Sequence, residues 1–457
     1  MEYLAFWMFG ATIVLLLIGY PVAFGLGGTA VLFTLIGSDF LPGIGIDLPW
    51  DPIFRVTRLY IMPQRIYGTI MENYTLVAVP FFVFMGVMLE RSGLAEELLE
   101  TMGVLFGKLR GGLAISVVVV GALLAASTGV VGASVVTMGI LALPVMLKYN
   151  YDKSLSSGVI AASGTLGQII PPSIVLVILG DQMGISVGQL FLGSFIPGFM
   201  LAGLFVIYVA VIAFLKPKVA PALPEEVRQF PPKVLAIKVV RSLVPPLFLI
   251  LIVLGSIFFG IATPTEAGAA GAIGAMLLAL INRKLNLDAL RSTMRQTVQL
   301  TSMVFIILVG ATAFSMVFTA LHGDVLVDNF LVNLPGGKWG FLFFTMVTVF
   351  ILGFFIDFIE ITFIVVPLIT PIAAHFFGAD MLLWFAVVIA MNLQSSFLTP
   401  PFGFALFYLK GVAPPEISTG HIYKGIIPFI IIQIVAMILL IVFPGIVNWL
   451  PSFSNAG

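Results

Sequence analysis

Two long apolar stretches of the chain each contain a pair of adjacent prolines. Pro171–Pro172 lies within Ser163–Ser173, and Pro400–Pro401 lies within Asn392–Gly403. Proline has no amide hydrogen and its ring clashes with the preceding helical turn, so a helix is expected to break at each pair. Two broken helices at corresponding places in the two halves of a hydrophobic chain indicate the binding site of a membrane transporter.

The chain is too apolar for a soluble protein. Of its 457 residues, 60% are hydrophobic and 9% are charged, whereas soluble domains carry about 25% charged residues. We therefore predict an all-α polytopic membrane protein. The formal net charge is zero, which gives no reason to expect a nucleic-acid partner. The absence of cysteine excludes disulfides, thiolate nucleophiles and cysteine-bound metals. The first apolar run lacks the features of a signal peptide, which predicts a retained helix.

A membrane-spanning helix needs about 20 apolar residues. Segments of this kind are predicted at 4–20, 21–37, 73–90, 154–181 and 188–215, and again at 243–261, 264–282, 298–321, 381–409 and 425–447. Two further stretches, 112–147 and 339–377, are each close to twice this length and have polar centres. We expect each to be a re-entrant hairpin, because non-helical backbone at membrane depth is tolerated where it is buried or faces water.

The two halves of the chain have the same order of predicted elements. Thr128 at the first hairpin tip and Asp357 at the second are 229 positions apart, and so are Pro171 and Pro400. We therefore predict two repeats and a polar cytoplasmic linker between them, at 1–215, 243–457 and 216–242 respectively. Each repeat has five crossings, which is an odd number. The second repeat must then enter the membrane from the opposite face, so the repeat is inverted.

Basic residues predict the orientation in the membrane. With these crossings, one side receives only four of the 21 Lys and Arg residues, which are Arg55, Arg58, Arg65 and Lys338. The positive-inside rule makes the other side cytoplasmic, which places both termini outside. The connectors 50–73 and 283–298 combine apolar and basic residues and are predicted to be helices in the headgroup plane.

The helix ends freed at the tips and breaks can bind ions. Freed amides can hold an anion, and freed carbonyls with hydroxyl and amide oxygens suit a hard cation such as Na⁺. For sodium we assign Ser127, Thr128, Gly129, Ser134, Gln168, Pro171, Asp357, Ser395, Ser396, Thr399 and Pro400. For the substrate we assign Gly132, Ser173, Gln394 and Glu360. No catalytic residue is expected, and Na⁺ is the only metal ion, acting as a coupling ion without any further cofactor.

Three acidic residues need separate interpretations. Ionisable groups at membrane depth are costly, so a functional role is the default for Asp357 and Glu360. The carboxyl of Asp357 has three open roles: binding sodium, binding a proton, or donating a hydrogen bond as a protonated packing group. Glu266 follows Thr263-Pro-Thr265 at the start of a span, where a carboxylate complements the helix dipole, and a structural role is favoured. The Ser and Gly residues of 127–134 have close helix packing as their alternative role.

Five segments resemble a known family when they are taken together. They are Arg110–Ala114 (RGGLA), Gly158–Ser173 (GVIAASGTLGQIIPPS), Ile261–Ala270 (IATPTEAGAA), Gly353–Asp357 (GFFID) and Leu398–Gly403 (LTPPFG). Over essentially its whole length the chain resembles the large membrane subunit of the tripartite ATP-independent periplasmic (TRAP) transporters. The resemblance implies an elevator-type, sodium-driven importer of small organic anions in a bacterial or archaeal cytoplasmic membrane. It also implies two partners, which are a separate small four-helix membrane subunit and a periplasmic substrate-binding protein.

The chain departs from the family at both hairpin tips. The first tip of the family commonly reads Ser-Gly-Ser, whereas Ser127–Ser134 reads STGVVGAS. At the second tip, many members carry small hydroxyl residues after the aspartate that corresponds to Asp357, whereas this chain has Phe358-Ile-Glu360. The second tip with Phe358-Ile-Glu360, taken together with Ser396–Glu416, is similar to the branch of the family named for keto-acid and mannitol/chloroaromatic systems. The expected substrates are therefore small 2-oxo or 2-hydroxy carboxylates.

Two other functions remain as alternatives. One is a self-sufficient anion symporter or antiporter of the same architecture, which would transport without partner proteins. The other is an intramembrane enzyme that uses Asp357 and Glu360. An enzyme would need a dyad, metal ligands or a nucleophile on facing helices. These two carboxylates are only three residues apart, and no His or Cys accompanies them at depth.

Overall fold

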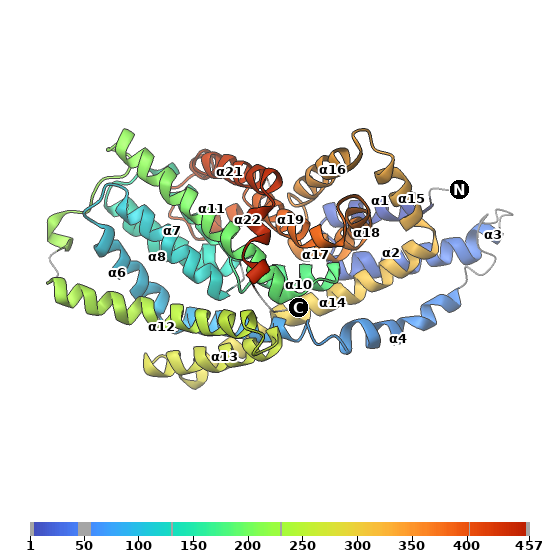
Figure 1. Ribbon diagram of the computed structural model, residues 1–457, viewed down its shortest axis with the longest axis horizontal. Coiled ribbons are helices and arrows are strands. Elements are labelled where there is room, and N and C mark those ends of the chain that lie inside the picture. The colour runs from blue at the N-terminus through green and yellow to red at the C-terminus, as the bar shows by residue number, and fades with distance from the viewer. Residues whose placement is uncertain (1–3, 44–55, 129–130, 229–230, 402, 454–457) are drawn as a thin grey trace. The chain divides into compact units, whose positions relative to one another are not determined.

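The computed structural model describes residues 4–43, 56–128, 131–228, 231–401 and 403–453. Every regular element in these ranges is a helix (Figure 1). The helices form two compact units: unit 1 is Met1–Leu76 with Gln299–Leu382, and unit 2 is Val77–Val298 with Leu383–Gly457. Within the described ranges, eight helices are long and apolar enough to cross a membrane, or ten if each of two bent pairs counts as one span. The all-α polytopic fold class is confirmed.

Unit 1 contains the N-terminal helices and the second predicted hairpin. Its elements are α1 (Leu4–Leu17), α2 (Val22–Leu35), η1 (Ile36–Phe40), α3 (Leu41–Gly43), η2 (Val56–Ile61), α4 (Met62–Ile66), η3 (Tyr67–Met71), the later part of α14 (Leu287–Ala320), α15 (Gly323–Val332), α16 (Gly337–Leu352), α17 (Phe358–Ile364), α18 (Val366–Phe377) and η6 (Ala379–Met381). The hydroxyls of Thr12 and Thr29 join α1 to α2 at 2.9 Å. The ring of Phe9 packs against Phe314 and Phe318 of α14.

The predicted hairpin at 339–377 forms three helices in unit 1. α16 ends at Leu352, and a short irregular segment leads to α17. α17 and α18 then meet at a bend of 59° beside Val365. Pro367 in the first turn of α18 explains the bend, because it has no amide hydrogen to continue the hydrogen bonding of α17. α18 packs against α16, so the chain doubles back on itself as a hairpin does.

Unit 2 contains the first hairpin and both broken spans. Its elements are α5 (Ala78–Arg91), α6 (Leu94–Phe106), α7 (Gly112–Thr128), α8 (Val131–Lys148), α9 (Lys153–Thr165), η4 (Leu166–Gln168), α10 (Ile174–Met183), α11 (Val187–Leu215), η5 (Glu225–Arg228), α12 (Pro232–Phe258), α13 (Pro264–Ile281), the start of α14, α19 (Leu382–Phe397), α20 (Phe404–Val412), α21 (Thr419–Val442), α22 (Gly445–Asn448) and η7 (Pro451–Phe453). α7 and α8 lie side by side as the predicted hairpin 112–147 (Figure 1). α9 packs against α7, α8 and α21.

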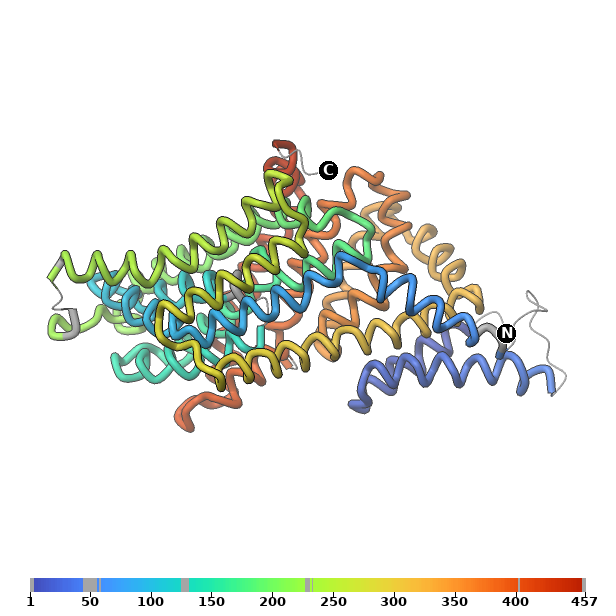
Figure 2. The backbone as a smooth tube through the Cα atoms, turned by 90° about the horizontal axis from the view of Figure 1, so that it is seen from below, coloured from blue at the N-terminus to red at the C-terminus, as the bar shows by residue number. Residues whose placement is uncertain are grey.

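Several helix boundaries differ from the sequence prediction. The connector 283–298 and the span 298–321 were expected as separate helices, but they form one continuous helix, α14 (Figure 2). The prediction of a boundary near Val298 was wrong because no glycine or proline interrupts the chain before Gly310. α12 begins at Pro232, so much of the predicted linker is helical. The short helices α6 and α15 were not predicted.

The base of the first hairpin is tied to the start of the linker. The amide of Gly111 donates to the carbonyl of Ala220 at 2.9 Å, and the amide of Asp152 donates to the carbonyl of Val219 at 2.9 Å. A third bond, at 3.0 Å, runs from the amide of Leu223 to the carbonyl of Gly107. The linker therefore joins the turn before α7 to the turn after α8.

α9 and α21 cross with their backbones in contact at two glycines. A Cβ atom added at Gly158 would overlap the carbonyl of Gly425, and one added at Gly425 would overlap the carbonyl of Ser154. We expect Gly425→Ala to destabilise the protein by about 1–3 kcal/mol, because overpacking forces backbone shifts. The measurement is the thermal unfolding temperature of the purified protein in detergent.

Gly255→Ala in α12 is the matched control for that substitution. A Cβ atom at Gly255 meets nothing within 4 Å, and alanine is a better helix former than glycine. The control is therefore expected to leave the unfolding temperature unchanged or slightly higher. Equal unfolding temperatures for Gly425→Ala and the wild type would show that the close crossing of α9 and α21 is not needed.

Candidate functional site

The first predicted broken span, 154–181, is broken in the structure. α9 ends at Thr165, a single 3₁₀ turn runs to Gln168, and α10 begins only at Ile174. Pro171 and Pro172, joined by a cis peptide bond, lie in this gap. The side chains of Thr165, Gln168 and Ser173 at the break are fully buried. Polar groups and free helix ends are thus placed inside an apolar span.

The second broken span, 381–409, has the same construction. α19 ends at Phe397 and α20 begins at Phe404. Pro400 and Pro401, also joined by a cis peptide bond, lie in the gap. The side chains of Gln394, Ser395 and Ser396 in the last turn of α19 are fully buried. Both breaks predicted from the proline pairs are therefore confirmed, and both lie in unit 2.

The two breaks touch each other through equivalent positions. The Gln394 side-chain amide (Nε2) lies 3.5 Å from the Thr165 hydroxyl oxygen, and these residues are 229 positions apart in sequence. This is the spacing that relates Pro171 to Pro400 and Thr128 to Asp357. Equivalent residues of two related halves contact each other only where the two-fold axis passes between them. The contact between Thr165 and Gln394 has the form expected at such an axis.

The hydroxyl groups at the breaks donate to backbone carbonyls. Ser173 donates to the carbonyl of Gln168 at 2.9 Å. In the second span the donors are Ser395, Ser396 and Thr399, which bond the carbonyls of Met391, Leu393 and Ser395 at 2.8, 2.8 and 2.7 Å. A hydroxyl that gives its hydrogen to a carbonyl keeps lone pairs on its own oxygen. These oxygens are therefore oriented as acceptors or ligands.

Two buried glutamines carry amide atoms without hydrogen-bond partners in the described part of the chain. These atoms are both side-chain amide atoms of Gln168 and the amide oxygen of Gln394. Leaving a buried polar atom unpaired costs about 1–3 kcal/mol, so such atoms are rare in native proteins. The unpaired amide oxygens and the nearby hydroxyl oxygens make a neutral oxygen donor set, which fits a hard cation such as Na⁺.

The first hairpin tip lies in the same unit as the breaks. The side chains of Ser127 and Thr128 and all of Gly129 fall outside the part that the structure describes, so their assignment stays a prediction. Ser134 is buried in the first turn of α8. A Cβ atom at Gly132 would lie 3.1 Å from the ring of Tyr408 in α20. The start of α8 therefore packs directly against the helix that follows the second break.

The second hairpin tip belongs to unit 1. Asp357 caps the N-terminus of α17, where its carboxylate accepts the amide of Phe358 at 2.6 Å. Glu360 is 6% exposed, and its Oε2 atom has no hydrogen-bond partner among the described residues. The cap gives Asp357 a structural role that the sequence did not predict. Its role toward sodium, and that of Glu360 toward the substrate, stay predictions.

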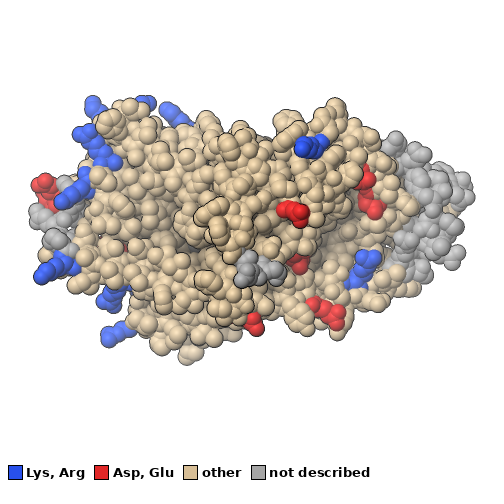
Figure 3. All heavy atoms as spheres, in the orientation of Figure 1, with Lys and Arg blue, Asp and Glu red and all other residues tan. Residues whose placement is uncertain are grey.

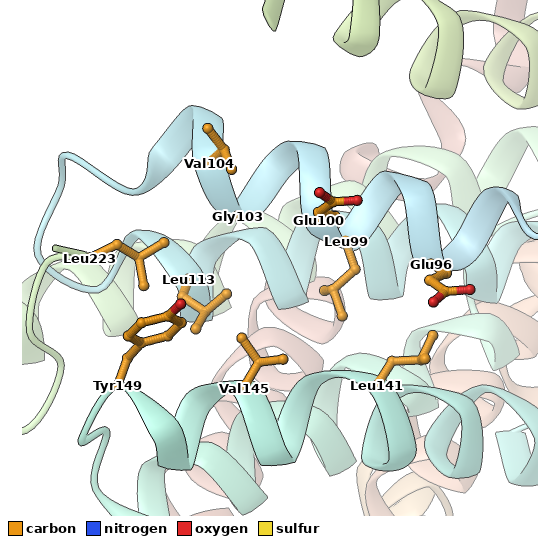
Figure 4. Close-up of a pocket in the computed structure, with 10 residues that line it drawn as sticks. All are labelled: Glu96, Leu99, Glu100, Gly103, Val104, Leu113, Leu141, Val145, Tyr149 and Leu223. Atoms are coloured by element: carbon orange, nitrogen blue, oxygen red, sulfur yellow. The ribbon is translucent and has the colours of Figure 1, made fainter. Parts of the chain in front are cut away.

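The cavity in Figure 4 lies at the base of the first hairpin. It has a volume of about 320 Å³ and is bounded by α6, α7, α8 and the linker. Leu113, Leu141 and Val145 form its apolar wall, with Glu96 and Glu100 on α6. Glu100 pairs with Lys238 at 3.7 Å on the exposed surface. None of the predicted site residues lines this cavity, so it is separate from the candidate site.

Sequence reasoning missed two residues at the breaks and the first tip. Thr165 would have been found by applying the spacing of 229 to Gln394, whereas the packing of Tyr408 against Gly132 has no sequence signal. Outside this region, Gln433 in α21 is also fully buried, and both of its amide atoms lack partners among the described residues. Glu266 forms a capping box with Thr263 at the start of α13, which confirms its predicted structural role.

The chain matches a known transporter family over nearly its whole length. Residues 9–446 match the family described as "Tripartite ATP-independent periplasmic transporter, DctM component". The C4-dicarboxylate TRAP transporter large permease protein DctM of Vibrio cholerae is 29% identical, over 97% of each chain. The isethionate TRAP transporter permease protein DctMQ of Oleidesulfovibrio alaskensis is 28% identical, over 96% of this chain and 65% of its own.

Among solved structures, the YdaH transporter of Alcanivorax borkumensis has a similar fold. Its TM-score is 0.63, and the match covers 94% of this chain and 98% of that one at 14% identity. At this identity the likeness concerns the fold alone. The family match spans nearly the whole chain and describes a transporter component, which leaves no support for an intramembrane enzyme. The chain is a multi-pass membrane protein that belongs to the DctM family, the large permease component of the tripartite ATP-independent periplasmic transporters.

Proposed function

We propose that the chain is the translocating subunit of a sodium-coupled importer of small organic anions that depends on a binding protein. The observation that carries the proposal is the pair of broken spans in unit 2. They meet through Thr165 and Gln394 and hold unpaired buried amide oxygens on Gln168 and Gln394. A transporter needs a polar site at the junction of two repeats, and the unpaired amide oxygens at both breaks supply ligands for one.

The donor groups of the breaks set the roles in the proposed site. The oxygens of Gln168, Ser395, Ser396 and Thr399 would hold sodium, because hard cations take neutral and charged oxygen ligands. We move Gln394, which the sequence assigned to the substrate, to the sodium site because its buried amide oxygen has no partner among the described residues. The amide groups at the starts of α10 and α20 would attract the anion, because a helix N-terminus carries positive partial charge. The first hairpin tip, which lies in the same unit as the breaks, would complete this site. Asp357 of unit 1 stays a predicted sodium ligand.

The proposed transport step is a movement of hairpins and broken spans against the remaining helices, as in an elevator. It assumes the inverted repeat of 1–215 and 243–457 and the cytoplasmic linker between them. The recurrence of helix boundaries supports the repeat: α9 begins at Lys153 and α19 at Leu382, and α10 begins at Ile174 and α20 at Phe404. With the linker inside the cell, both termini face outward.

The substrate class rests on the chemistry of the relatives and on the variant second tip. The names of two relatives contain a C4-dicarboxylate and isethionate, and both compounds are small organic anions. We propose small organic acids for this chain, with 2-oxo and 2-hydroxy carboxylates first because Phe358-Ile-Glu360 follows Asp357.

A tripartite transporter has two components besides the large membrane subunit. We propose a small membrane subunit of four helices and a periplasmic substrate-binding protein. The DctMQ relative supports a membrane partner, because this chain covers only 65% of its length. In that relative, additional sequence is joined to the part that matches this chain.

The proposal predicts that uptake requires all components. Proteoliposomes that contain the chain with its small subunit should accumulate a labelled 2-oxo acid under a sodium gradient only after the binding protein is added. Removing either the binding protein or the small subunit should lower the uptake rate at least 100-fold. The control is vesicles that contain the small subunit alone. Robust uptake by this chain alone would instead assign it as a self-sufficient symporter or antiporter.

A further inference from the structure

A cavity of about 190 Å³ lies within unit 1, next to the second hairpin. Its described lining residues belong to α1, α14, α15, α16 and α18 and to Val365 at the bend before α18. Four phenylalanine rings form two pairs in its wall. Phe330 and Phe344 meet edge to face with their centroids 5.4 Å apart. Phe9 and Phe318 meet at a tilt, with centroids 6.4 Å apart. The wall is therefore apolar and rich in aromatic rings.

The hydroxyl of Thr345 lies at this cavity without a hydrogen-bond partner. Thr345 is 2% exposed and lines the cavity, and its Oγ1 atom bonds no group in the described part of the chain. The residue 229 positions earlier is Ser116, whose hydroxyl donates to the carbonyl of Met102 at 2.7 Å. The same spacing relates Met102 to Leu331, which lines the cavity. A contact made between α6 and α7 is thus replaced by open space between α15 and α16.

Neither an empty space nor water suits this cavity. An empty cavity forfeits dispersion contacts around its wall and leaves the buried hydroxyl desolvated without a partner. A buried water molecule needs two to four polar partners, whereas Thr345 and Thr348 carry the only polar side chains among the described lining residues. A cavity of about 150 Å³ lined by Leu, Ile and Phe stays dry and binds benzene. The cavity beside Thr345 therefore has room for one aromatic ring with a small substituent.

The wall also decides the charge of a ligand. The described lining residues include no Lys, Arg, His, Asp or Glu, so a charged molecule would lose its hydration without compensation. Phe330 and Phe344 are partly exposed, and this pair therefore marks an open side of the cavity. The face of the molecule in Figure 3 carries few Lys, Arg, Asp or Glu side chains. A neutral aromatic molecule dissolved in hydrocarbon can approach such a surface, and its ring can pair edge to face with the phenylalanines.

We propose that this cavity binds a neutral molecule with a single aromatic ring and one hydroxyl group, such as a phenol, and that the ligand hydroxyl bonds the hydroxyl of Thr345. The acyl chain of a lipid is a poorer fit, because it would leave the Thr345 hydroxyl unpaired. The bound ring contacts α1, α14 and α15 as well as the hairpin helices α16 and α18. It therefore ties the second hairpin to its neighbours within unit 1.

The test is binding of 4-fluorophenol to the full chain in lipid nanodiscs, followed by fluorine NMR and corrected for uptake into empty nanodiscs. 4-Fluorotoluene, which has a methyl group in place of the hydroxyl, is the second probe. We expect saturable binding of 4-fluorophenol. Thr345→Val keeps nearly the same shape and removes the hydroxyl, so it should weaken binding of 4-fluorophenol at least fivefold and leave binding of 4-fluorotoluene unchanged. Failure of 4-fluorophenol to saturate, or equal affinity for it in the wild type and the valine variant, would overturn the proposal.

Val327→Phe tests the location of the site. Val327 of α15 lines the cavity, so the larger ring should fill the space and lower binding of both probes at least tenfold. Val325→Phe is the matched control, because Val325 lies on the same helix, is half exposed and is not part of the cavity wall. The control should bind both probes as the wild type does. Undiminished binding in a Val327→Phe protein that unfolds at the wild-type temperature would contradict the assignment. None of these readouts depends on transport, so they can fail while the proposed function stands.

Discussion

Replacing Gln168 and Gln394 together with leucine is expected to abolish sodium-dependent uptake without destabilising the protein. Both side chains are fully buried at the breaks, and three of their four amide atoms have no hydrogen-bond partner among the described residues. Leucine removes the unpaired atoms and their desolvation cost, which is about 1–3 kcal/mol for a buried polar group. The same change removes the amide oxygens that we propose as sodium ligands.

Uptake should therefore fall in this variant, whereas stability should not. We expect the uptake rate to fall at least 100-fold, while the thermal unfolding temperature in sodium-free buffer stays equal to the wild type or rises. Sodium should raise the unfolding temperature of the wild type, because a ligand that binds only the folded state stabilises it. The double variant should have lost this response.

Gln433→Leu is the matched control for these substitutions. Gln433 is equally buried in α21, and both of its amide atoms lack partners in the described ranges, but it lies outside the two breaks. The control should also be as stable as the wild type, and it should keep both uptake and the response to sodium. If the double leucine variant transported normally, the assignment of Gln168 and Gln394 to the sodium site would be wrong.

Asp357 is expected to be indispensable for transport for a reason beyond its role as a helix cap. Its carboxyl group accepts the amide of Phe358, so Asp357→Ala removes both a carboxyl group and a cap. Loss of a cap costs about 1 kcal/mol, which is a modest effect on stability. Loss of the sodium ligand that we propose should remove sodium-dependent uptake entirely.

Asp357→Asn separates the two roles, because asparagine is as good a cap as aspartate. We expect Asp357→Asn to keep the unfolding temperature of the wild type and to lose uptake as completely as Asp357→Ala. The measurement is the initial rate of uptake at saturating sodium, normalised to the amount of folded protein. Normal uptake in the asparagine variant would reduce Asp357 to a structural cap and remove it from the sodium site.

The parts of the fold that the sequence predicted correctly depend on local rules. The gaps before α10 and α20 followed from the proline pairs at Pro171 and Pro400 taken together with their matching positions in the two halves. Prolines alone were not a sufficient signal, because Pro245 and Pro246 lie inside α12 without ending it. Apolar runs of sufficient length predicted α11 and α13 almost to the residue. The capping pair of Thr263 and Glu266 was likewise a local pattern.

The errors arose where local rules compete. The basic residues of 283–298 indicated a separate surface helix, but helix continuity needs only the absence of breakers, so α14 runs through. The bend between α5 and α6, of 58°, places a second helix after a predicted span, and Ser92-Gly93 at this bend is a weak signal. Reading basic residues as the end of a span placed the boundary of α14 at Val298. The same reasoning placed the start of α12 at 243 instead of Pro232.

The candidate site was predicted in its elements but not in its contacts. Gln168, Gln394 and Thr399 were identified as polar residues beside the two proline pairs, and the spacing of 229 related the proline pairs to each other. The sequence did not reveal that Thr165 contacts Gln394, because a contact between residues far apart in sequence depends on how their helices pack. Which amide atoms remain unpaired is also a property of the packed structure, and no single sequence pattern encodes it.

The most direct test of the account is uptake driven by a sodium gradient alone. The chain, its small subunit and its binding protein would be reconstituted in proteoliposomes without ATP, and accumulation of a labelled organic acid would be followed with sodium outside, with equal sodium on both sides, and with potassium in its place. We predict accumulation only in the first condition, and none for the double leucine variant of Gln168 and Gln394. Equal accumulation without sodium would contradict the central claim that these two breaks couple the movement of the anion to sodium.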